Sequence, residues 1–115
     1  MWKTIFDKLK ENNLNPYPPG RHKGVCEKEY CIVKEGNQIP HLRSNRLGQK
    51  VMDLILVVPL NSYIQIEPYA QSIREAMKGL KTLRKTGVET PVIVDDDKKA
   101  YTMSIEYVIQ KKLEG

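Results

Sequence analysis

Apolar and polar residues alternate most clearly in the last part of the chain. From Tyr101 to Ile109 every second residue is tyrosine, methionine or isoleucine, and the residues between them are mostly polar. A period of two predicts a strand with one face in the core and one in solvent. Residues 92–94 predict its antiparallel partner, so the chain is expected to end in a β-hairpin.

Residues 51–58 form a second apolar run. Both of its faces are apolar except at Asp53. Such a strand is expected to lie centrally in a sheet, with cover on both sides. A shorter strand is expected around Tyr30 and Ile32.

Two segments have helical spacing instead. Trp2, Phe6 and Leu9 predict an N-terminal helix within residues 1–13. A second helix is expected with Pro68 in its first turn, where no backbone donor is needed. Its buried stripe should contain Tyr69, Ile73, Ala76, Met77 and Leu80.

The remaining segments are predicted as connections. Residues 14–24, with "NPYPPGRHKG", are too rich in proline and glycine for a helix or strand. Residues 36–50 are expected to form a long polar loop, mobile in the free protein and ordered on assembly. The whole predicts one α+β domain, 1–115. Its small, mostly antiparallel sheet has about four strands, ends in a C-terminal β-hairpin and is packed by two main helices.

Composition narrows the class of protein. Hydrophobic residues make up 40% and charged residues 29%, a balance typical of soluble globular proteins. The apolar runs are too short to cross a bilayer, and the charged start lacks a signal-peptide block. An intracellular protein is therefore expected. The net charge of +5 permits nucleic acid or an acidic protein as partner.

Candidate chemistry is sparse. Cys26 and Cys31 are spaced more loosely than structural zinc pairs, so reduced thiols in or beside a strand are expected. His22 and His41 lie in polar, loop-like surroundings. The chain has no glycine-rich nucleotide motif, no H-E-x-x-H and no nucleophile elbow. Neither an enzyme nor a cofactor or metal site is expected.

Three consecutive aspartates, Asp95, Asp96 and Asp97, are read as the polar tip of the C-terminal hairpin. Adjacent side chains near a strand end point to opposite sides and cannot all converge on one ion. Aspartate suits a turn, because its carboxylate accepts hydrogen bonds from nearby backbone amides.

Two stretches carry only basic side chains and are the candidate partner-binding residues. Either could contact phosphate or an acidic protein surface, and either could equally be a solvated basic face. No aromatic residue interleaves, so stacking on bases is not indicated. The candidates are His41, Arg43, Arg46 and Lys50 in the first stretch, and Lys81, Arg84 and Lys85 in the second, where Lys78 also lies.

The segments "IEPYAQSIREAMKGL" and "TGVETPVIVDDDKKAYTMSIEYVIQKK" resemble the tail-terminator (tail completion, minor tail) proteins of long-tailed bacteriophages and prophages. The resemblance covers most of the chain from about Val51, in a T-G-x-E-[TS]-P turn, an acidic hairpin and an S-I-E-Y strand. It implies a structural protein that forms a ring of six copies on the finished tail tube. Implied partners are other copies, the tube protein and the head connector; implied locations are the host cytoplasm during assembly and then the virion.

Two other functions remain open from the sequence. One is a different neck or head–tail joining protein of the phage. The other is a small basic nucleic-acid-binding module, whose affinity would fall steeply with salt; specific nucleic-acid binding and membrane contact are not expected.

Replacing Asp95, Asp96 and Asp97 together by asparagine should leave the fold intact, since asparagine takes the same turn role. Calorimetric titration of the wild type with divalent metals should show no tight site. A micromolar site that disappears in the triple variant would contradict the turn interpretation.

Overall fold

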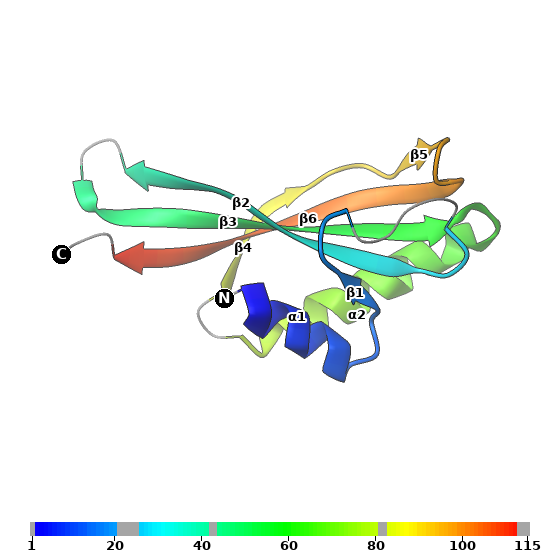
Figure 1. The fold of residues 1–115 in the computed structure, drawn as a ribbon, viewed down its shortest axis with the longest axis horizontal. Coiled ribbons are helices and arrows are strands. Elements are labelled where there is room, and N and C mark those ends of the chain that lie inside the picture. Colours follow the sequence, from blue (N-terminus) through cyan, green and yellow to red (C-terminus); the bar gives the residue numbers. More distant parts are fainter. Residues whose placement is uncertain (1, 21–25, 42–43, 81–82, 113–115) are drawn as a thin grey trace.

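The computed structural model describes residues 2–20, 26–41, 44–80 and 83–112, with side chains outside 36–50 and 110–112. These residues form an α+β fold in which two helices pack on a mixed, open sheet of six strands (Figure 1). The helices are α1 (Trp2–Glu11) and α2 (Ile66–Lys78), with a 3-10 segment, η1 (Leu60–Gln65), before α2. The strands are β1 (Pro16–Tyr17), β2 (Tyr30–His41), β3 (Ser44–Pro59), β4 (Leu83–Glu89), β5 (Ile93–Asp95) and β6 (Ala100–Lys112).

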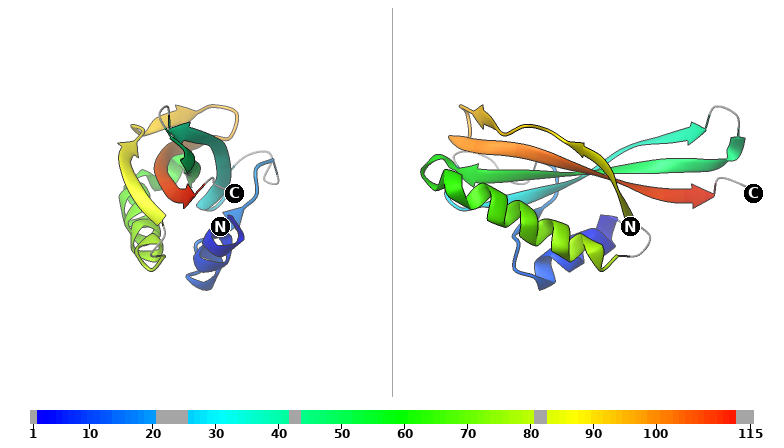
Figure 2. Two further views of the ribbon diagram at one scale, coloured as in Figure 1. Left: turned by 90° about the vertical axis from the view of Figure 1, so that its left-hand side faces the viewer. Right: turned by 180° about the vertical axis from the view of Figure 1, so that it is seen from behind.

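The sheet order is β1-β2-β3-β6-β4, and β5 pairs with the start of β6 on the same side as β4. All pairs are antiparallel except β1 with β2. β3 is therefore central, as its apolar run predicts. Both helices lie on one face of the sheet, here called the inner face (Figure 2).

The main core fills the space between the inner face and the helices, and it confirms the predicted stripes. Trp2 and Phe6 are partly buried and stack on each other, while Ile5 and Leu9 beside them are fully buried. The strands and α2 supply the remaining large side chains. These include Met52, Leu54, Leu56 and Val58 of β3, Ile73 and Met77 of α2, and Met103, Ile105, Tyr107 and Ile109 of β6.

The other face of the sheet, the outer face, has only local cover. A small cluster of Cys26, Tyr30, Val57 and Ala100 buries one end of β3 on this side, with Ile32 and Ile55 partly buried beside it. Both cysteines are free and buried. The expectation of cover along both faces of the central strand thus holds only near Val57 within the described residues.

The predicted loop at residues 36–50 is wrong. β2 runs to His41 and β3 starts at Ser44, so most of this segment is an antiparallel hairpin. β6 continues the ladder on the other side of β3, as far as Leu47 opposite Lys112. Backbone pairing with strands that enter the core holds these polar residues extended, and such pairing needs no alternation of apolar side chains.

Two more strands escape the prediction and raise the count from about four to six. β1 lies inside the connector 14–24, where the amide of Cys31 donates to the carbonyl of Asn15 at 3.1 Å. Proline is tolerated there because the strand is at a sheet edge. β4 shows no alternation, since only Leu83 is buried in it. Residues 21–25 of the connector lie outside the described residues.

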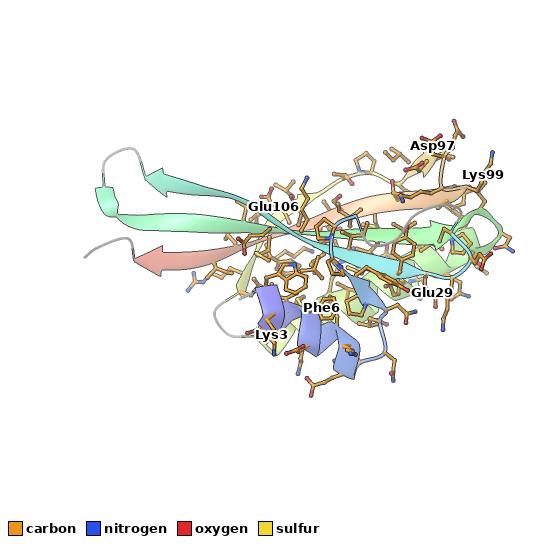
Figure 3. The ribbon with its side chains drawn as sticks, in the orientation of Figure 1. Lys3, Phe6, Glu29, Asp97, Lys99 and Glu106 are labelled. Carbon is orange, nitrogen blue, oxygen red and sulfur yellow. The ribbon has the colours of Figure 1, made fainter. Side chains whose placement is uncertain are left out.

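The aspartate turn is confirmed as a hairpin tip. β5 pairs with β6 through Asp95 opposite Ala100, and residues 96–99 form the turn between them. Oδ1 of Asp95 accepts a hydrogen bond from the backbone amide of Lys98 at 3.1 Å. The side chain thus takes the predicted turn role, at the end of the molecule where Figure 3 places Asp97 and Lys99.

Ile105→Ala should lower the free energy of unfolding by about 2–5 kcal/mol, because it leaves a cavity among fully buried side chains. Ile64→Ala is the matched control, since Ile64 in η1 is 79% exposed. Urea unfolding followed by circular dichroism measures both. Equal effects of the two substitutions would refute the assignment of the inner face.

Candidate functional site: a basic arm and the outer face

The structure brings the two basic stretches to the same level of the sheet. Lys50 of β3 and Leu83 of β4 are both register partners of Ile109, from opposite sides of β6. Two strand spacings, or about 10 Å, therefore separate the backbone of Lys50 from the start of the second stretch. Arg46 and His41 lie farther out, on β3 and at the end of β2. Arg43 and Lys81 lie outside the described residues.

The outer parts of β2, β3 and β6 form an arm, defined here as residues 36–41, 44–50 and 110–112. It extends past α1, away from the helices (Figure 1). The arm contains no aspartate or glutamate, and its basic residues besides His41 are Arg46, Lys50, Lys111 and Lys112. Lys111 and Lys112 are not among the candidates predicted from the sequence, although their position after the alternating strand indicates them.

Part of the second basic stretch already forms an ion pair with a carboxylate of the same chain. Nζ of Lys85 lies 2.6 Å from Oε2 of Glu89, whereas Arg84 is exposed. Glu89 also receives a bidentate contact from Arg74 of α2, Nη2 to Oε1 at 2.8 Å and Nε to Oε2 at 3.1 Å. Nη1 of Arg74 reaches Glu67 at 2.8 Å. Hydrogen bonds from Arg74 are the main cause of the lowered pKa of Glu89.

The contact between Arg74 and Glu89 holds β4 against α2. Because β4 is the edge strand, this contact fixes the edge of the outer face. β4 has a register shift between Lys85 and Glu89, with Gly87 at φ +88°, a conformation that favours glycine. After the shift, Thr90 and Ser104 continue the pairing. The amide of Thr90 donates to the carbonyl of Ser104 at 3.0 Å, and the amide of Ser104 donates to Oγ1 of Thr90 at 2.8 Å.

A charged row crosses the outer face where the arm leaves the body. Asp53 of β3 is the register partner of Lys34 on β2 and of Glu106 on β6. Figure 3 shows Glu106 near the middle of the sheet, where the arm begins. Burial is the main cause of a raised pKa for Asp53; the negative charge of Glu106 raises it further, and Lys34 lowers it in part. Like charges directly opposite on adjacent strands are destabilising.

A groove of about 280 Å³ lies along this row. It is bordered by the carboxylates on one side and by apolar and hydroxyl side chains on the other. Its lining residues are Lys34, Asp53, Ile55, Val88, Thr90, Ser104 and Glu106. Val88 is 53% exposed although it is apolar. The groove therefore combines negative charge with uncovered apolar surface.

A larger groove of about 580 Å³ lies between the end of α1 and β1. Its described lining has one cation, Lys10, with Asn13, Asn15 and the rings of Phe6 and Tyr17. This lining offers no nucleophilic thiol, carboxylate or imidazole.

Among the residues that the structure describes, no three His, Cys, Asp or Glu side chains gather where they could hold a metal ion. None of the helices described is both long and apolar enough to span a membrane.

Comparison with models of known protein families finds no match, and comparison with curated proteins finds no significant similarity.

Asp53→Asn should raise the melting temperature at pH 7 by a few degrees. Folding raises the pKa of Asp53, so the ionised carboxylate destabilises the native state. This destabilisation develops as the pH rises from the unfolded-state pKa to the folded-state pKa. The gain should vanish below about pH 4, where the unfolded-state aspartate is also protonated. Asp7→Asn, on the exposed side of α1, is the control.

Glu106→Gln should lower the pKa of Asp53, measured by NMR titration of its carboxyl carbon; an unchanged pKa would contradict coupling of the pair.

Proposed function

We propose that this protein is a tail terminator of a long-tailed bacteriophage or prophage. In this role copies of the chain form a ring, six by the family resemblance, that ends tail-tube growth and offers a surface to the head connector. The protein is a structural component without catalytic activity. It assembles in the host cytoplasm and stays at the tail–head interface of the virion.

The observation that carries the proposal is the presence of two surfaces of different charge on one sheet. The basic arm extends from one end, and the outer face with its carboxylate pair lies on the body. A closed ring requires heterologous contacts, in which one surface of a copy meets a different surface of the next. A chain with such a pair of surfaces suits a ring better than a symmetric dimer.

The segments that carry the resemblance support a structural role. The first contains the whole of α2, and the second contains the end of β4 together with β5 and β6. Their side chains build the core and the borders of the outer face: Ile73 and Ile105 are fully buried, and Arg74 holds Glu89. The segments that resemble the family therefore form the framework of the sheet and α2 that positions the arm.

The basic arm also favours a second candidate, electrostatic binding of nucleic acid, because phosphates attract lysine and arginine. The arm segments contain no aromatic residue that could stack on bases. A salt titration with duplex and single-stranded DNA separates the two functions. Tight, sequence-biased binding that falls steeply with salt would favour the nucleic-acid module.

A stop codon early in this gene, in the phage or prophage that encodes it, should yield tails that are over-long and carry no head. Without a terminator, tube subunits continue to add and no surface forms for the connector. Electron microscopy of induced lysates measures tail length and head attachment. Expression of the wild-type protein in trans should restore both, and the Ile64→Ala protein, altered at an exposed site, should restore them equally.

Tails of normal length bearing heads, produced in the absence of the protein, would reject the terminator function. Tails of normal length without heads would instead indicate the alternative neck or head–tail joining role.

A further inference from the structure

We propose that the basic arm of one copy docks in the outer-face groove of the next copy, with its cationic side chains against Asp53 and Glu106. This inference rests on the proposed function, because it names the repeated contact that would close the ring. The occupant is a second copy of this chain.

The two carboxylates of the groove repel each other in a single copy. Asp53 and Glu106 stand opposite each other on β3 and β6, and within the described residues neither carboxylate forms an ion pair. Lys34 offsets the charge of Asp53 only in part. A cation placed between the two carboxylates would relieve their repulsion, which gives the groove a preference for lysine or arginine.

Apolar surface beside the carboxylates favours a protein occupant over a small cation. Val88 lines the groove and is 53% exposed, and Ile55 beside it is partly buried. Ile93 of β5 is 59% exposed and is the register partner of Thr102, which places it on the same outer face. Contact surfaces between proteins combine such apolar side chains with charged neighbours.

The arm has the complementary composition. Its described strand segments carry Arg46, Lys50, Lys111 and Lys112 and no acidic residue. The aliphatic stems of lysine and arginine can also cover apolar surface such as Val88 while their charged ends reach a carboxylate.

A copy cannot fill its own groove with its own arm. Lys50 and Asp53 belong to the same uninterrupted strand, β3, and its pairing with β6 continues without a register shift through both positions. The arm therefore points away from the groove along the axis of the sheet (Figure 1). Only the arm of another molecule can reach it, and the resulting contact is heterologous.

Two charge variants test this contact. The groove variant carries Asp53→Asn and Glu106→Lys, and the arm variant carries Arg46→Glu, Lys50→Glu, Lys111→Glu and Lys112→Glu, so that the arm becomes anionic. A control with the same charge change as the groove variant carries Asp7→Asn and Glu11→Lys on exposed positions of α1. Circular dichroism first verifies that each variant is folded, and sedimentation velocity then measures self-association up to about 1 mM, where even weak contacts are populated.

Each charge variant alone should associate at least about tenfold more weakly than the wild type, because like charges now meet in every contact. An equimolar mixture of the two should recover association. In an alternating assembly the cationic arm of a groove variant meets the acidic groove of an arm variant, and the anionic arm meets the cationic groove. The α1 control should associate as the wild type does.

Three outcomes would overturn the contact: wild-type protein that stays monomeric at about 1 mM, a folded single variant that associates as the wild type does, or a mixture that does not recover. The stop-codon experiment is independent of these results. Over-long, headless tails in the stop-codon lysate together with a failed mixing test would reject this contact and leave the terminator function. Normal headed tails without the protein would reject the function and leave the contact measurable.

Discussion

The pairing of β3 with β6 is the constraint on which the rest of the structure depends. It runs without a register shift from Pro59 opposite Ala100 to Leu47 opposite Lys112. On the inner face of the sheet, this pair of strands contributes core residues from both strands. On the outer face it places Asp53 opposite Glu106. Its end farthest from the helices forms two of the three strands of the arm. A slip by one residue would turn every side chain of a strand to the other face, so the core and the carboxylate pair are fixed together.

The helices protect the sheet edges of the body but not those of the arm. At one edge, Nε1 of Trp2 donates to the carbonyl of Val33 on β2 at 2.7 Å, just beyond the pairing with β1. At the other edge, Arg74 of α2 holds Glu89 of β4. Unpaired strand edges are templates for pairing with other chains. In the arm, Pro40 in β2 removes one backbone donor, which limits such pairing.

The sequence predicts the elements whose side chains alternate between core and solvent. Helical spacing identifies α1 and α2, and a period of two identifies β6, because burial on one face requires these patterns. The arm lacks the pattern, since its strands are held by backbone pairing. β4 lacks it because only Leu83 is buried. The basic residues of the candidate site are visible as runs of charge. The pairing of Asp53 with Glu106 is not, because it depends on strand register between positions far apart in the chain.

Continuity between arm and body has a mechanical consequence. Hydrogen bonds of an antiparallel ladder lie across the strands, so a force along the strand axis loads many of them side by side. A force that separated strand ends would instead break them one after another. Since β3 and β6 enter the core without interruption, tension on the arm reaches the packed body as shear along the ladder. If copies are joined through their arms, as proposed, this geometry would let them transmit load from core to core without first separating the strands of the sheet.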